Sequence, residues 1–465
     1  MSIFKIFYKT SLFSAALAAT LFTFAPAAQA SSLSTNWNMA SIWEGPGGEL
    51  ASHSPLQSRA NTSTADGRLT VFWALANNLV PGDTNNASDI FIFDRITKMT
   101  QRVNIGAGNT EGNGHTRNAT ISADGRYIGF TTLATNTAAG PQCIPGHDCA
   151  FSGVLDRTTG AITVASKDNS TGQLMPVTLG VRPIVTMHPA IISGDGHSFL
   201  FSVTSQTATD QTPDIFVRNL ITGVVTQANV KNNGQPSDKG ALDPSISDDG
   251  RFVVFSSMVI LTPDANGTFD VFMRDMVQGT TKLVSHAHQS RTTANDGSQS
   301  AKISGNGQLI VFKSFASNLV AGGNLGNGSI FLYDRQTDTT RQIMARRGEQ
   351  PNDSSSYPSI SADGSHITFM SNASNFTHAD TRDIDMFLHY TRALITRKIK
   401  LPPRTDVEMT LMGTPVINAD GKAISYLFYT RSPINPALNS YGASLNYDPV
   451  SHIPFYDPGD IVDIF

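Results

Sequence analysis

Two loops in this chain combine acidic and amide side chains at a spacing that suits a bound cation. The pattern Asp-x-Asn-x-x-x-Asp occurs twice, as Asp83, Asn85 and Asp89 and again as Asp264, Asn266 and Asp270. This spacing gathers hard oxygen ligands around one loop, as calcium prefers, although the glycine and distal glutamate of an EF-hand loop are missing. The alternative is that these side chains only stabilise turns by hydrogen bonding to the backbone. We expect calcium binding or turn stabilisation at both loops.

A second group of residues is suited to binding an anion. The positions five residues before three consecutive copies of a repeated turn motif, described below, hold Arg59, Arg117 and His188, and Asp243 lies one position further on in the fourth repeat. Paired hydrogen bonds from arginine can hold a carboxylate or phosphate. The alternative is that these side chains are solvated or pair with neighbouring aspartates. We expect a ligand site where these four residues meet.

The two cysteines form a third group. Cys143 and Cys149 lie six positions apart in CIPGHDC. In an oxidising compartment such a pair forms a local disulfide. The competing interpretation is a metal site with His147 and Asp148, but a second cysteine pair is missing. The spacing favours a disulfide.

Catalytic motifs are scarce. The sequence has no G-x-S-x-G nucleophile elbow. A metal-dependent polysaccharide lyase or hydrolase would need several histidines converging on one site, and His188, His286 and His288 are the only plausible set. We predict no catalytic residue, and a non-enzymatic role is favoured.

A turn motif that recurs seven times must position these groups. The pattern is Ser/Thr-x-Asp-Gly-x followed by a β-branched and aromatic run, and its copies begin at Thr64, Ser122, Ser193, Ser247, Ser304, Ser361 and Asn418. The turn glycines lie 54 to 71 residues apart, which indicates one supersecondary unit repeated along the chain. We number these repeats one to seven.

Each repeat has the pattern of a four-stranded antiparallel meander. In the second repeat, NATIS and RYIGFTT flank Asp124-Gly125, a pair that is typical of a two-residue hairpin turn with positive φ angles. A third strand follows a longer polar loop, as in DIFIFD from Asp89, and a fourth follows a short turn, as in MTQRV from Met99. Four-stranded units that repeat radially make a β-propeller. We therefore predict an all-β protein, a seven-bladed β-propeller of four-stranded antiparallel blades.

The S-x-D-G-x-x-x-x-F turn followed by a D-I/V-F-x-x-D strand resembles the WD-like repeat of TolB-type β-propellers, and the resemblance covers essentially the whole mature chain. It implies the propeller fold for residues 31–465. Only about 30 mature residues precede the first repeat, so TolB's separate N-terminal domain has no counterpart, and TolB's partner interactions are not implied.

Closure of the ring needs a complete seventh blade. Lys422–Tyr429 and Ala443–Asp448 have the pattern of its second and third strands, but Pro454 and Pro458 suit a central strand badly. The segment Thr35–Ser41 resembles the fourth strand of the other blades. We expect it to complete the last blade, in competition with the C-terminal tail.

The N-terminal segment and the composition place the protein outside the cytoplasm. Residues 1–30 have the charged start, apolar stretch and Ala28-Gln29-Ala30 site of a cleaved signal peptide, and no later segment is apolar enough to span a membrane. Charged residues make up 15% of the chain, and the net charge is −4 with a pI near 6.2. No basic stripe exists for a nucleic-acid backbone. We expect a periplasmic or secreted monomer.

Variable loops indicate which face carries the function. The first-to-second and third-to-fourth turns are short, whereas the second-to-third loops and the connections between repeats are long and polar. Binding residues usually lie on such loops. We therefore predict a binding or scaffold protein for a protein or glycan ligand on this loop-rich face, with calcium as the only candidate cofactor. The alternative is a carbohydrate-active enzyme with its site at the channel mouth.

Overall fold

The computed structural model describes residues 62–425, with gaps at 104, 141–149, 176–189, 204–212, 238, 259–265, 378–383, 400–407 and 412–414. Of strands β1, β2, β26, β29, β30 and β31, only the backbone is described. Within these residues the elements are strands, apart from one 3-10 turn, η1 (Arg346–Gly348). The signal peptide predicted for residues 1–30 lies outside the described part.

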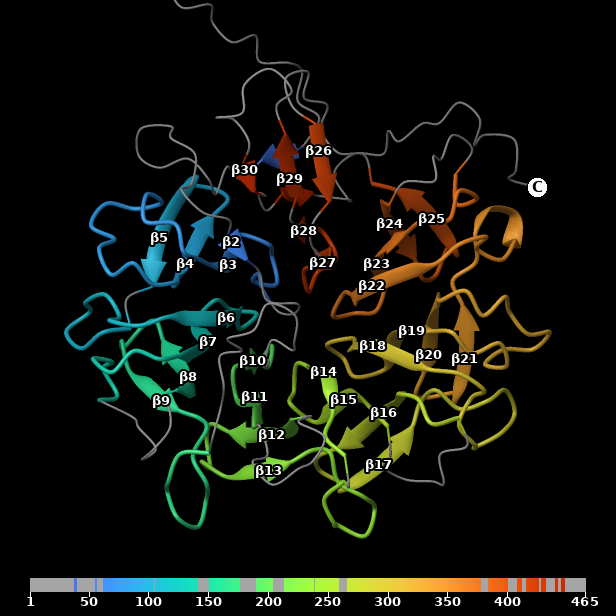
Figure 1. Ribbon diagram of the computed structural model, residues 1–465, viewed down its shortest axis with the longest axis horizontal. Coiled ribbons are helices and arrows are strands. Elements are labelled where there is room, and N and C mark those ends of the chain that lie inside the picture. The colour runs from blue at the N-terminus through green and yellow to red at the C-terminus, as the bar shows by residue number, and fades with distance from the viewer. Residues whose placement is uncertain are drawn as a thin grey trace, which may run out of the picture. The chain divides into compact units, whose positions relative to one another are not determined.

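Six four-stranded antiparallel sheets follow one another along the chain (Figure 1). In each sheet the strand order equals the chain order, as predicted for meanders. The first sheet contains β2 (Pro55–Leu56), β3 (Leu69–Ala74), β4 (Asp89–Asp94) and β5 (Met99–Val103); the second contains β6 (Thr116–Ile121), β7 (Tyr127–Thr132), β8 (Phe151–Asp156) and β9 (Ile162–Val164); the third contains β10 (Ala190–Ile192), β11 (Ser198–Val203), β12 (Asp214–Asn219) and β13 (Val225–Gln227).

The fourth, fifth and sixth sheets have the same plan. They contain β14 (Leu242–Ile246), β15 (Phe252–Ser257), β16 (Asp270–Asp275) and β17 (Thr280–Leu283); β18 (Ser298–Ile303), β19 (Leu309–Ser314), β20 (Ser329–Asp334) and β21 (Thr339–Gln342); and β22 (Ser355–Ile360), β23 (His366–Ser371), β24 (Asp385–Tyr390) and β25 (Ile395–Lys398). All-β architecture with these six meanders agrees with the sequence pattern.

The turn motif folds differently from the predicted two-residue hairpin. In the second repeat Ser122 N donates to Tyr127 O and Gly125 N donates to Ser122 O, so the turn between these strands is four residues long. Only Gly125 has a positive φ, +77°. Asp124 acts instead through its side chain, because its Oδ1 accepts hydrogen bonds from Ser122 Oγ (2.6 Å) and Arg126 N (2.9 Å). Ser and Asp of the motif therefore cap the turn, and glycine alone supplies the left-handed conformation.

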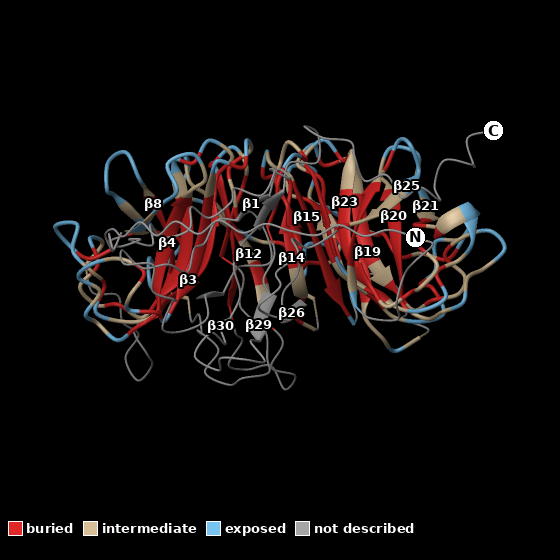
Figure 2. Ribbon diagram, turned by 90° about the horizontal axis from the view of Figure 1, so that it is seen from above, coloured by how far each residue is buried: buried red, intermediate tan, exposed pale blue. Residues whose placement is uncertain are grey.

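Phenylalanines of the motif make the core. The last residue of the turn motif pairs across the sheet with the phenylalanine of the D-I/V-F strand, as in Phe72 with Phe91 and Phe312 with Phe331, whose rings stack at 5.5 and 5.8 Å. Such cross-strand aromatic pairs stabilise a sheet. Further apolar side chains pack between successive sheets, and Figure 2 shows the strands buried and the loops at both of their ends exposed.

Neighbouring sheets are joined at their innermost turns. The second residue of each motif accepts a backbone hydrogen bond, from Ala65 N to Ala123 O, from Ala123 N to Gly194 O, from Asp195 N to Asp248 O, from Asp248 N to Gly305 O, from Asn306 N to Ala362 O, and from Ala362 N to Ala419 O. The seventh such bond runs from Asp420 N back to Ala65 O (3.2 Å). A second bond, from Asn418 Nδ2 to Ala65 O (2.7 Å), supports it.

The seventh repeat departs from the other six. Its motif lies between β27 (Val416–Ile417) and β28 (Ile424–Ser425), and β26 (Glu408–Leu411), β29 (Phe428–Arg431) and β30 (Ser440–Tyr441) form a separate three-stranded sheet. The predicted second strand, Lys422–Tyr429, is therefore wrong, because its two halves belong to different sheets. The N-terminal strand β1 (Trp37–Met39) lies in the segment expected to be the fourth strand of the last blade, and it pairs antiparallel with β31 (Leu445–Tyr447), which lies in the expected third strand. These two strands form a separate two-stranded sheet.

Candidate functional site

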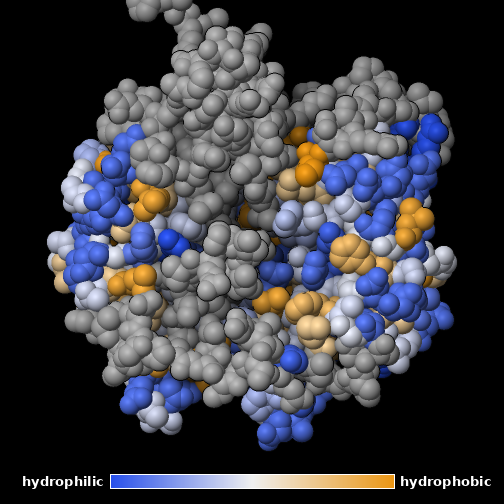
Figure 3. Space-filling view, viewed as in Figure 1, coloured by the Kyte–Doolittle hydropathy of each residue, from blue (hydrophilic) through white to orange (hydrophobic). Residues whose placement is uncertain are grey.

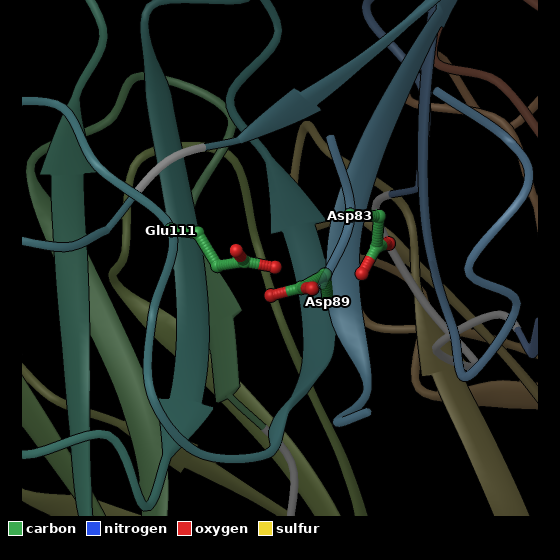
Figure 4. Close-up of side chains that lie close together, drawn as sticks. All are labelled: Asp83, Asp89 and Glu111. Atoms are coloured by element: carbon green, nitrogen blue, oxygen red, sulfur yellow. The ribbon is translucent and has the colours of Figure 1, made fainter. Parts of the chain in front are cut away.

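Three acidic side chains converge where the first sheet meets the connection to the second (Figure 4). Asp89 begins β4, Asp83 lies in the loop before it, and Glu111 lies in the connection between β5 and β6. One oxygen atom from each carboxylate lies within 4.8 Å of the other two. With Arg102 of β5, whose Nη1 donates to Glu111 Oε1 (2.9 Å), these residues form what we call the charged corner.

Burial sets the electrostatics of the charged corner. Burial raises the pKa of Asp89 to about 7, with a further contribution from the charges of Asp83 and Glu111. Burial also raises the pKa of Asp83, and Arg102 partly opposes this shift. The pKa of Glu111 is lowered although burial acts to raise it, because Thr84, Asn85 and Arg102 favour its charged form. The corner is therefore short of positive charge near neutral pH.

The predicted calcium ligands are brought together only in part. Asn85 uses its amide nitrogen to donate to Asp89 Oδ2 (2.9 Å) and to Gly112 O (2.8 Å), so it acts as the turn-stabilising residue that the alternative described. Glu111 was missed because it lies 22 residues beyond Asp89 in sequence. Of the second loop, Asp264 lies outside the described residues, Asn266 Nδ2 donates to Ala294 O (2.8 Å), and Asp270 accepts from Ser285 Oγ (2.8 Å).

Arg117 lies at the start of the innermost strand of the second sheet, as predicted. Its guanidinium lies over the ring of Trp73, 5.2 Å from the ring centroid, and its Nε donates to Ser88 Oγ (3.2 Å). Burial lowers its pKa, and no carboxylate among the described residues pairs with it. His115 is held beside it, because Ser88 N donates to His115 Nδ1 (2.9 Å). A half-buried guanidinium thus keeps its two terminal amino groups without a described protein acceptor.

Other predicted members of the anion site are less well placed. Arg59 and His188 lie outside the described residues, as do Cys143 and Cys149. Asp243 lies in β14 with a φ of +51° and forms part of a register shift between Leu242 and Ser245. The same shift recurs in β6, β18 and β22, where the left-handed residues are Asn118, Ser300 and Tyr357. These bulges, which the repeated motif does not predict, change the direction of the innermost strands near the predicted site.

Two cavities of different size lie among the described residues. The innermost turns surround a narrow cavity of about 50 Å³, whose lining includes Ile121, Ile246, Ile303, Ile360 and the side chain of Asp248. That volume suits a water molecule or two and excludes a sugar ring. A larger side groove of about 540 Å³ lies between the outer strands of the first two sheets and is lined by Gln101, Arg102, Asn109, Arg157 and others. A groove of that size can accept a small ligand.

The described surface is mainly polar on the face shown in Figure 3. Apolar residues are scattered there in small separate patches between hydrophilic ones. A wide apolar patch would indicate an obligate protein interface.

Comparisons with known proteins identify the fold. No family model matches the chain, and no curated protein matches it. The solved structure of an oligogalacturonate lyase from Vibrio parahaemolyticus is similar, with 12% identity over 86% of this chain and 92% of the lyase and a TM-score of 0.50. The β-propeller domain of the Trilobed protease from Pyrococcus furiosus matches 85% of this chain and 95% of that domain with 9% identity and a TM-score of 0.48. TolB from Acinetobacter baumannii matches 82% of this chain and 81% of TolB with 12% identity and a TM-score of 0.36.

The fold is a β-propeller. Successive four-stranded meanders joined through their innermost turns are the arrangement of that class, and the likeness to the lyase agrees with it. At 12% identity this likeness concerns the fold alone and carries no reaction to this chain. Among the described residues no helix has the length and apolar character needed to cross a bilayer.

Proposed function

We propose that this chain is an exported, monomeric, seven-bladed β-propeller that binds an anionic group of a protein or glycan in the cell envelope or outside the cell. The bond from Asp420 N to Ala65 O and the pairing of β1 with β31 support seven blades in a closed ring. Export rests on the signal-peptide pattern of residues 1–30, and the Cys143–Cys149 disulfide stays a prediction of the same kind.

The environment of the Arg117 guanidinium is the main support for this proposal. The half-buried Arg117 guanidinium is partly desolvated, and the ring of Trp73 stabilises its charge only in part. A carboxylate or phosphate that reaches its free amino groups would form two parallel charge-assisted hydrogen bonds. The narrow cavity at the opposite end is too small for such a ligand. Access from the loop-rich face is therefore the arrangement we favour.

Binding assays on three arginine variants test this proposal. The wild-type protein is first screened on an array of acidic and neutral oligosaccharides and by pull-down from envelope and culture fractions. Each charge-assisted hydrogen bond contributes roughly 1.5–3 kcal/mol, so Arg117→Ala is expected to weaken binding roughly 10- to 100-fold. Arg126→Ala is the matched control, because Arg126 pairs with Asp156 beside a tight turn.

The third variant, Arg157→Ala, removes a guanidinium from the side groove. Binding that depends on Arg157 and not on Arg117 would move the ligand to that groove. Equal losses in all three variants, or none in Arg117→Ala, would contradict the proposal.

A further inference from the structure

The charged corner has a neutral counterpart between the fifth and sixth sheets. Ser329 begins β20 as Asp89 begins β4, and Gly323 lies six positions before Ser329 as Asp83 does before Asp89. Gln342 pairs with Phe331 in the register in which Arg102 pairs with Phe91. Gln350 Oε1 accepts from Leu325 N (2.9 Å), as Glu111 Oε1 accepts from Asn85 N (3.1 Å). We call Gly323, Ser329, Gln342 and Gln350 the neutral corner; its existence shows that this fold does not require the acidic residues.

Asp83 is the residue in the charged corner whose carboxylate lacks a hydrogen bond at one oxygen. Its side chain is 2% exposed, and its Oδ1 is a buried atom without a hydrogen-bond partner among the described residues. The nearest cationic atom, Arg102 Nη1, is 3.6 Å away, which exceeds a hydrogen-bond distance. In Figure 4 the Asp83, Asp89 and Glu111 side chains extend toward a common space. A buried carboxylate oxygen that makes one long ion pair and no hydrogen bond is a candidate ligand for a further cation.

The coordination preferences of the cations favour calcium. Calcium binds oxygen ligands at about 2.3–2.6 Å, so two of its ligands can lie up to about 5.2 Å apart. Oxygen atoms of Asp83, Asp89 and Glu111 lie within 4.8 Å of one another. Magnesium demands stricter geometry and usually keeps several waters, so a site with three protein carboxylates suits calcium better.

We propose that the charged corner is a calcium site whose protein ligands are Asp83, Asp89 and Glu111. Arg102 stays paired with Glu111 Oε1, and the three carboxylates then face a total positive charge of three from calcium and Arg102. The site joins the Asp83 loop to the connection between the first two sheets. It differs from the pattern in the sequence, because Glu111 replaces Asn85 as a ligand. It does not depend on the proposed ligand at Arg117.

Thermal unfolding of the mature wild-type protein in millimolar calcium, in millimolar magnesium and in chelator tests the site. A ligand that binds only the folded state raises its stability by mass action. We expect the melting temperature to rise by about 2 °C or more in calcium relative to chelator, and calorimetric titration with calcium to give binding heat. Magnesium should give a smaller shift.

Variants that introduce residue types of the neutral corner remove proposed calcium ligands and should keep the backbone architecture. Asp89→Ser and Glu111→Gln introduce the residue types of Ser329 and Gln350, and each should abolish the calcium shift while keeping a melting temperature in chelator close to that of the wild type. Asp94→Asn is the control, since Asp94 lies at the other end of β4 and pairs with Arg68. Coincident wild-type melts in calcium and chelator, a retained shift in both ligand variants, or an equal loss in Asp94→Asn would overturn the proposal.

Discussion

The charged and neutral corners have the same backbone architecture and different electrostatics. In both, an asparagine Nδ2 binds the backbone carbonyl of the central residue, Asn136 to Glu111 O (2.9 Å) and Asn375 to Gln350 O (2.8 Å). Arg102 and Gln350 each also donate to a loop carbonyl, Gly82 O and Gly323 O respectively. The neutral corner satisfies these contacts with amides and a hydroxyl, so the scaffold is made by neutral hydrogen bonds.

This difference indicates that the backbone architecture forms without the buried charges of the charged corner. Buried ion pairs bring little net stability compared with neutral side chains of similar size. Three carboxylates against one arginine would therefore be a cost to the folded protein. The proposed calcium site would use Asp83 and Glu111, which the neutral corner lacks, together with Asp89, the first residue of the repeated D-I/V-F strand.

Replacing Arg102 is expected to give the largest difference in unfolding free energy between the two corners. Arg102→Gln copies the neutral corner but leaves three buried carboxylates without their cation, which should cost about 3 kcal/mol of unfolding free energy in chelator. Calcium should restore part of that loss. Gln342→Ala, the equivalent truncation, should cost about 1 kcal/mol. Urea unfolding with and without calcium measures both, and equal costs would mean that the corners do not differ in charge balance.

The buried His389 makes stability depend on pH, and this limits the pH range in which the stabilities of corner variants can be compared. Burial, with Arg341 nearby, lowers the pKa of His389 to about 4, against about 6.5 in an unfolded chain. Below pH 6.5 the unfolded state takes up a proton at this histidine that the folded state does not, so the contribution of His389 to stability falls as the pH drops from 6.5 toward 4. The expected loss from His389 alone at pH 5 is about 2 kcal/mol, and the raised pKa of Asp89 acts in the opposite direction over this range.

Unfolding curves of the wild type and of His389→Gln across this pH range check that loss. Relative to the wild type, the variant should gain stability as the pH falls from 6.5 toward 4. An unchanged slope would assign the pH dependence to other groups, and corner variants would then have to be compared above pH 6.5 only.

The smallest effects should be equal in the two corners. Asn113 Nδ2 donates to Thr135 Oγ1 (2.9 Å) and Asn352 Nδ2 donates to Ser374 Oγ (3.0 Å), and each Oδ1 accepts from the backbone N–H of that same partner. Asn113→Ala and Asn352→Ala should each cost about 1 kcal/mol. Chemical denaturation of the two variants side by side checks this equality. A clearly larger loss for Asn113→Ala would show that the scaffolds themselves differ.

Much of the fold could be predicted because the repeated motif encodes local structure directly. Glycine, Asp and Ser of the motif specify the turn, and phenylalanines at fixed offsets pair across each sheet. The four-residue length of the turn was missed because Asp-Gly also suits a shorter hairpin, and only the Asp124 side-chain bonds distinguish the two. The seventh repeat was mispredicted because the pattern of Lys422–Tyr429 does not show that its two halves join different sheets.

The candidate sites were predicted less completely, because they depend on contacts between distant segments. Asp83 and Asp89 were found since they share a loop, whereas Glu111 comes from another connection and has no local signal. Left-handed residues at Asn118 and Asp243 are of types that tolerate that conformation, but Ser300 and Tyr357 are not. Equal spacing from the turn motif placed Arg117 correctly, and Trp73 beneath it was not anticipated.

Asp248 limits which substitutions can occur at the equivalent position of its two neighbouring repeats. It is the charged residue at a motif position that holds alanine in four repeats and glycine in the other two, Gly194 and Gly305. A methyl group added at either glycine would collide with the Asp248 carboxylate. Drift of either glycine to alanine therefore requires the Asp248 side chain to shift or to be replaced, and at Gly305 the Ala362 Cβ must move as well. Substitutions in these three repeats are therefore coupled, whereas the other four already share alanine.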